Sequence, residues 1–218
     1  MKMKRFMWIV AVFFLFAFLT ACAGTPVRDA VKVDLKFPIG NIEGNQFTGI
    51  RYPFKVAAPP GWQVVTKYPK FMVDLGYHEE GLEESEVFLF NPVTHPNLQI
   101  DFTPAGRYAT SDRKKIERLV DAVTGEMEDE AKEHFGKDVK VTAGPLEAVS
   151  LKGAPFAAKR YSAYQAKGQV REQGWLYAFA EPYQIFILYI ILEKEGANDR
   201  EAFKAILDSF EYIPQEKK

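Results

Sequence analysis

Four strand-like runs near the carboxyl end of the chain are separated by very short breaks, and this spacing restricts the fold more than any other feature. The runs are residues 139–149, 156–166, 170–180 and 184–192. The breaks between them are residues 152–155, 167–169 and 181–183. Parallel neighbours need a crossover of a dozen or more residues, so breaks of this length allow only antiparallel neighbours. The sequence therefore predicts an antiparallel meander.

Further strands and two helices complete the predicted fold. Short alternating or apolar segments predict additional strands at residues 50–56, 62–66, 86–90 and 98–102. The run from Ile185 to Ile191 is apolar at every position, which indicates a central strand covered on both faces. Helices expected at residues 111–134 and 198–210 supply that cover. We expect an α+β fold, an antiparallel sheet of six or seven strands flanked by helices.

Both expected helices carry an apolar stripe together with boundary signals. Ser111 is the expected N-cap of the first helix, and Gly136 the expected end. Asn198 and Glu201 have a capping-box spacing at the start of the second helix. The stripe of the first helix consists of Ile116, Leu119, Val120, Val123, Met127 and Ala131. The second helix is expected to bury Phe203, Ile206, Leu207 and Phe210.

The amino-terminal segment has the pattern of an export signal that ends at a cysteine. Three basic residues precede an apolar run of 14 residues, 6–19, which is short for a bilayer span and typical of a signal-peptide core. Leu19-Thr20-Ala21-Cys22 resembles the lipobox of bacterial lipoproteins, in which the cysteine sulfur carries a diacylglyceryl group. That resemblance implies a membrane anchor at Cys22. In that family an aspartate directly after the cysteine favours retention in the inner membrane. This position is Ala23 here, so the resemblance implies the outer membrane, with the protein facing the periplasm.

These signals divide the chain into four parts. We expect a lipoprotein signal peptide over residues 1–21, and the lipidated Cys22 with a Gly- and Pro-containing tether over residues 22–46. One short strand is expected in that tether, at residues 31–37. The folded domain is expected over residues 47–213, followed by a polar tail at 214–218.

Charge and cysteine content exclude several classes of protein. Without residues 1–21 the chain holds 25 basic and 29 acidic side chains, a net charge of −4. A nucleic-acid-binding protein normally carries a basic surplus, so we expect no nucleic-acid partner. The single cysteine excludes an internal disulfide and a multi-cysteine zinc site.

Two segments resemble the fold family of the photosystem II extrinsic protein PsbP. They are the turn Pro59-Pro60-Gly61-Trp62, and the closing pattern of residues 202–210 with its paired apolar positions. The resemblance covers roughly residues 47–213. That family includes a Ran-binding nuclear-import factor and bacterial envelope lipoproteins. It implies an α/β/α sandwich that docks to macromolecules, without a shared catalytic residue. Trp62 and Phe210 are the expected core anchors.

The residues that carry chemistry show no catalytic arrangement. His78, His95 and His134 have no ligand spacing, and nucleophile-elbow, phosphate-loop and dinucleotide motifs are absent from the sequence. We therefore expect no enzyme and no cofactor. The densest acidic cluster is expected to be a solubilising surface loop, with two alternatives: a weak site for a calcium-like cation, or a docking surface for a basic partner. It consists of Asp74, Glu79, Glu80, Glu83, Glu84 and Glu86.

Two hypotheses for function follow. The first is a lipid-anchored envelope protein whose domain binds another envelope protein without catalysis. The alternative is a carrier of a small apolar ligand, held in a cavity between sheet and helix. The aromatic residues of the meander are expected to be core and strand-surface residues, and alternatively to line that cavity: Tyr161, Tyr164, Trp175, Tyr177, Phe179, Tyr183, Phe186 and Tyr189.

Overall fold

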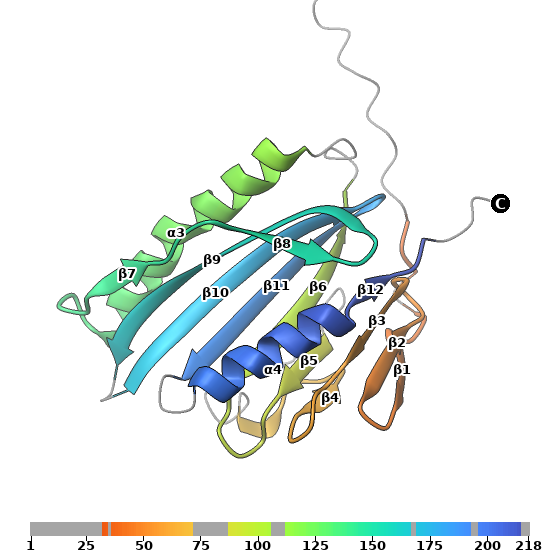
Figure 1. The fold of residues 1–218 in the computed structure, drawn as a ribbon, viewed down its shortest axis with the longest axis horizontal. Helices are drawn as coiled ribbons and strands as arrows, with labels where there is room; N and C mark the ends of the chain where they lie inside the picture. The colour runs from red at the N-terminus through yellow and green to blue at the C-terminus, as the bar shows by residue number, and fades with distance from the viewer. Residues whose placement is uncertain are drawn as a thin grey trace, which may run out of the picture.

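The predicted meander forms the centre of the molecule. The computed structural model describes residues 32–34, 36–71, 87–105, 112–166, 169–192 and 196–214. Strands β9 (Ala154–Ala166), β10 (Gln169–Ala180) and β11 (Tyr183–Leu192) are antiparallel neighbours in chain order (Figure 1). Their register places Gly174 of β10 between Tyr161 of β9 and Tyr189 of β11.

The remaining strands of the large sheet extend the meander on both sides. Beyond β11 lie β6 (Asn97–Pro104), β5 (Val87–Phe90) and β4 (Gln63–Val65), all antiparallel. On the other side, β7 (Val141–Ala143) and β8 (Glu147–Leu151) both pair with β9. The described part of this sheet thus contains eight strands, in the order β4-β5-β6-β11-β10-β9-β7 with β8 beside β9.

The run 139–149, expected as one strand, is divided into β7 and β8. Residues 144–146, Gly-Pro-Leu, lie between the two strands. Proline has no N–H to donate to a sheet, and a Cβ on Gly144 would overlap the ring of Tyr161. The break lets β8 take its own path along β9, and this path forms one wall of the site described below.

A second, four-stranded sheet was not predicted. It has the order β1 (Gly40–Glu43), β2 (Gln46–Gly49), β3 (Phe54–Ala57) and β12 (Glu211–Tyr212). Hence the expected tether over residues 22–46 is wrong from residue 40 onward. Gly44 and Asn45 form a two-residue hairpin turn, with Gly44 at a φ of 61°.

Two strand predictions in the same region also need correction. No strand is present among the described residues of 31–37, and the strand expected at 50–56 is limited to β3. The N–H groups of Ile50 and Arg51 both donate to the Ile39 carbonyl, so the chain bends before β3 begins.

Helix α3 (Arg113–Phe135) covers the face of the large sheet formed by β9 and β10. Its N-cap is Asp112 rather than Ser111, and the Asp112 carboxylate accepts the Lys115 N–H at 2.9 Å. Gly136 ends the helix as predicted. The predicted stripe is confirmed: its six residues pack in the two apolar clusters under this helix.

Helix α4 (Gly196–Ser209) crosses the opposite face, in front of the sheet in Figure 1. It begins two residues before Asn198, so Asn198 lies in the helix instead of capping it. Phe203, Ile206, Leu207 and Phe210 are buried, as predicted. No helix in the described part of the chain combines the length and apolar character required to cross a bilayer.

The strands divide their side chains between two apolar cores. Along β11 the odd-numbered residues are buried toward α4, while the even-numbered ones are half-buried on the α3 side. Trp175 and Phe179 pack under α3, and the Trp175 indole N–H donates to the Val120 carbonyl at 2.6 Å. Trp62 and Phe210 lie in the larger core as predicted. The α+β architecture with helices on both faces of the sheet is confirmed.

Candidate functional site

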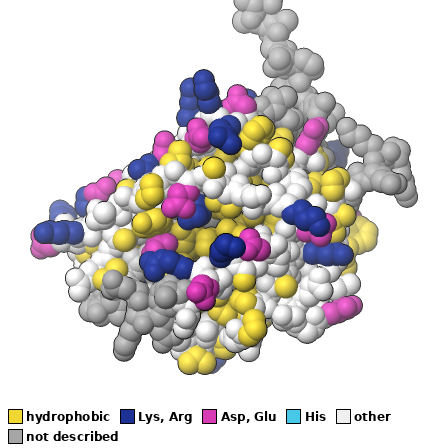
Figure 2. Space-filling view, in the orientation of Figure 1, with side chains coloured by type: hydrophobic (Ala, Val, Ile, Leu, Met, Phe, Trp, Pro, Cys, Tyr) yellow, Lys and Arg dark blue, Asp and Glu magenta, His cyan; other side chains and the backbone are white. Residues whose placement is uncertain are grey.

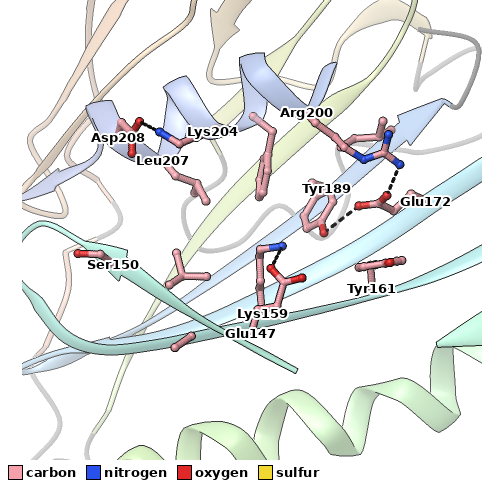
Figure 3. Close-up of a pocket in the computed structure, with 14 residues that line it drawn as sticks. Glu147, Ser150, Lys159, Tyr161, Glu172, Tyr189, Arg200, Lys204, Leu207 and Asp208 are labelled. Atoms are coloured by element: carbon pink, nitrogen blue, oxygen red, sulfur yellow. Dashed lines mark hydrogen bonds and ion pairs between the residues drawn. The ribbon is translucent and has the colours of Figure 1, made fainter. Parts of the chain in front are cut away.

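A groove of about 680 Å³ lies between α4 and the edge of the large sheet. Four consecutive residues of β8, 147–150, form one wall, and positions 200–208 of α4 form the other. The floor consists of residues from β9, β10 and β11 (Figure 3). We call this feature the α4–β8 groove. Its volume falls within the range of about 300–1,000 Å³ that is common for ligand sites.

The shape of the floor depends on one glycine in the middle of β10. The Tyr189 ring lies across Gly174, where a Cβ would overlap its Cζ, Cε1 and Oη atoms. On its other side the Tyr189 ring stacks on Phe203 of α4, with ring centroids 4.2 Å apart. Gly174 therefore allows Tyr189 to lie flat and to hold α4 against the sheet.

Apolar side chains line the middle of the groove. Val149, Ile191, Phe203 and Leu207 line it from β8, β11 and α4. Phe203 and Leu207 lie one turn apart on the same face of α4, so both reach the floor. A ligand would therefore contact a continuous apolar strip between the wall formed by α4 and the wall formed by β8.

Three ion pairs surround this strip. Glu147–Lys159 and Lys204–Asp208 each have N–O distances of 2.6 Å, and Glu172–Arg200 has one of 2.7 Å. Figure 2 shows basic and acidic side chains next to one another on this face, with apolar atoms between them. The six charges cancel, so the groove offers no net charge to attract an ionic ligand.

Glu172 is the most enclosed of these charges. Its side chain is 11% exposed, and it accepts hydrogen bonds from Arg200 at 2.7 Å and from the Tyr189 hydroxyl at 3.3 Å. Burial, followed by the charge of Glu172, raises the pKa of Tyr189. Tyr189 therefore stays neutral, and its hydroxyl donates a hydrogen bond to the Glu172 carboxylate. The hydrogen bond to Glu172 likewise raises the pKa of Arg200.

This arrangement is suited to binding. Each carboxylate of the groove is paired with a cation, so none is placed as a free general acid or base. Among the described residues, no group of three or more His, Cys, Asp or Glu is close enough to hold a metal ion. The groove can hold a neutral molecule with apolar groups, and it offers hydrogen bonds at its edges.

Among the described residues, most of the predicted candidates lie outside this groove. Cys22, His78 and the whole acidic cluster at 74–86 fall outside the described residues. Of the eight aromatic candidates, Tyr161 and Tyr189 line the groove. Tyr183 belongs to the main core, and the other five lie on the α3 side of the sheet: Tyr164, Trp175, Tyr177, Phe179 and Phe186.

The charged groove residues were missed by the sequence analysis. A signal was present: Glu172 has the same strand parity as Gly174, Leu176 and Ala178, so the register buries it on the core face. An acid on the buried face of a central strand needs a partner. Arg200, 28 positions further along the chain, supplies it.

Comparison with known proteins supports the fold. No protein-family model matches the chain, and no curated protein matches it significantly. Among solved structures, cyanobacterial PsbP (CyanoP) from Synechocystis sp. PCC 6803 has a TM-score of 0.51 and 13% identity. That match covers 81% of this chain and 100% of CyanoP.

Two other structures are similar at lower scores. LpqN, involved in cell envelope biogenesis of Mycobacterium tuberculosis, has a TM-score of 0.48 and 13% identity over 74% of this chain and 84% of its own. The Ran-binding protein Mog1p of Saccharomyces cerevisiae has a TM-score of 0.41 and 12% identity over 73% and 90%. At such identities a structural likeness concerns the fold alone. Of these three structures, CyanoP has a TM-score above 0.5 and supports the PsbP-like fold.

Proposed function

Starting from the PsbP-like fold and its α4–β8 groove, we propose that the chain is a non-catalytic binding protein of the bacterial cell envelope, anchored through lipid on Cys22. The anchor rests on the sequence around Leu19-Thr20-Ala21-Cys22. We assign the anchor to the outer membrane on the basis of Ala23 alone. The binding role rests on the groove.

The observation that carries the binding role is the combination of an apolar strip with internally paired charges. The strip supplies favourable contact for a ligand, at roughly 25 cal/mol for each Å² of apolar surface that leaves water. The three ion pairs need no ligand to satisfy them. The groove is therefore formed before a ligand arrives, which reduces the ordering cost of binding.

The carrier of a small apolar ligand remains the second candidate. Its supporting observation is position: the groove lies between sheet and helix, as that hypothesis requires. The ion pairs at the rim favour the first candidate, because a purely apolar ligand gains nothing from charged groups around it.

A matched pair of valines tests the binding role. Val149 lines the groove and Val123 packs under α3, and both are half-buried. Val149→Trp fills the groove with an indole ring, whereas Val123→Trp places the same ring on the other side of the sheet. The full chains are purified from their native membrane in mild detergent, and bound molecules are measured by native mass spectrometry.

We expect wild type and Val123→Trp to retain their bound species. Val149→Trp should lose it by about tenfold or more, equivalent to about 1.4 kcal/mol of binding free energy. Circular dichroism confirms that both variants are folded. Equal occupancy in Val149→Trp and Val123→Trp would refute binding in the groove.

A further inference from the structure

We infer that the α4–β8 groove accepts an extended peptide segment of a partner protein, which adds as a strand to the outer edge of β8. This inference rests on the proposed function, because it names the ligand class of the same groove. Its evidence is the direction of the backbone groups along β8.

The backbone N–H and C=O groups of Ala148 and Ser150 point away from β9, toward the outer edge of β8. The Gly144 N–H donates to the Tyr161 carbonyl at 2.7 Å, so residue 161 of β9 directs its backbone groups toward the β7–β8 side. This direction alternates along an antiparallel strand, so the backbone groups of Lys159 also point toward β8, where Lys159 pairs with Glu147. The register shifts between Val149 and Leu151, but the extra residue lies on β9, so the alternation along β8 itself continues. Ala148 and Ser150, which have the opposite phase to Glu147, therefore direct their backbone groups away from β9.

This outer edge borders the groove. Ala148 and Ser150 both line the groove and both are exposed. Among the described strands β8 pairs only with β9. The outward N–H and C=O groups of Ala148 and Ser150 are thus two residues apart, which is the spacing that an added strand requires.

The same edge already accepts a strand immediately beyond the groove. The Lys152 carbonyl accepts the Tyr212 N–H at 2.9 Å, and Lys152 and Glu211 form a parallel bridge. The Lys152 ammonium also lies 2.8 Å from the Glu211 carboxylate. The edge is therefore oriented so that a neighbouring chain reaches its backbone groups.

The groove lining specifies the segment. Successive side chains of a strand point to opposite sides, so every second side chain of an added strand would face the apolar strip. The remaining side chains would face solvent between the ion pairs. Since the groove charges cancel, the fitting segment is neutral, with apolar and polar residues in alternation.

Ser150→Pro and Ser150→Ala separate strand addition from other modes of binding. Proline removes the outward N–H and obstructs the edge, yet it is tolerated on edge strands; alanine keeps the backbone intact. The probe is a phage-displayed library of random linear decapeptides, presented to the full lipidated chain in detergent micelles. Thermal unfolding shows whether each variant is folded.

We expect peptides selected on wild type to bind Ser150→Ala equally and to bind Ser150→Pro at least tenfold more weakly. They should protect the Ser150 amide from hydrogen exchange, and their affinity should not change with salt. Peptides that bind Ser150→Pro as well as wild type, or a library without binders, would overturn the inference.

Two further readouts keep the inference falsifiable. In the free wild-type chain the Ser150 amide should exchange with solvent much faster than the amides of Glu147 and Val149. This measurement does not depend on whether Ser150→Pro folds. A protected Ser150 amide would contradict the edge assignment. A bound small molecule that Val149→Trp displaces, with no peptide binder, would overturn strand addition while leaving the proposed function intact.

Discussion

Gly174→Ala is expected to destabilise the fold, although alanine usually improves a strand. The new Cβ would overlap the Tyr189 ring, which is 1% exposed and stacked on Phe203, so the ring has no free space to enter. Overpacking of this kind costs about 1–3 kcal/mol. Replacing a strand glycine by alanine returns roughly 0.5–1 kcal/mol. Because the new Cβ would overlap the Cζ, Cε1 and Oη atoms of Tyr189, we take about 2–3 kcal/mol for the overpacking and about 1 kcal/mol for the alanine gain. The difference is a net loss of about 1–2 kcal/mol in the free energy of unfolding.

Urea unfolding followed by circular dichroism measures this loss. For a chain of this size it corresponds to a decrease of about 2–8 °C in Tm. Gly125→Ala is the matched control, because a Cβ there meets no atom within 4 Å. That helical substitution should stabilise by about 0.5–1 kcal/mol.

A second background isolates the contact itself. In Tyr189→Ala the ring is absent, so adding Gly174→Ala should no longer destabilise the protein, and the two effects should be strongly non-additive. If Gly174→Ala is as stable as wild type, or if its effect is the same without the ring, the account of the groove floor is wrong.

Two further predictions concern pH and the anchor. Burial raises the pKa of Asp101 to about 6, against a partly opposing hydrogen bond from Gln99. The native state therefore keeps a proton that the unfolded chain loses, so stability should fall as pH rises from about 4 to 6, by up to about 3 kcal/mol. Asp101→Asn should remove this fall, and an unchanged pH dependence in urea titrations would contradict it. Cys22→Ser should leave an uncleaved precursor, detected by mass spectrometry as a chain that retains residues 1–21. Normal cleavage would refute the lipobox.

Predictions from the sequence succeeded where a pattern extends over many residues. The breaks at 167–169 and 181–183 were sufficient to place β9, β10 and β11 side by side, because no other connection fits such short turns. The stripe from Ile116 to Ala131 likewise identified α3 and its buried face. In both cases local geometry alone determines the outcome.

Prediction failed where the outcome depends on contacts between distant segments. The four-residue strands β1 and β2 are too short to show a clear period, and β12 becomes a strand only by pairing with β3. Glu172 and Arg200 reveal no relation in the sequence, because their contact requires both the register of β10 and the position of α4. The groove belongs to this second class, and so do the charged residues that surround it.

Site-specific photo-crosslinking in the native membrane shows whether a ligand binds in the α4–β8 groove. A benzophenone amino acid replaces Ala148, an exposed residue of the groove, or Ala122, an exposed residue of α3. We predict a covalent adduct from position 148 and none from position 122. Equal adducts from both positions, or an adduct from position 122 alone, would contradict it.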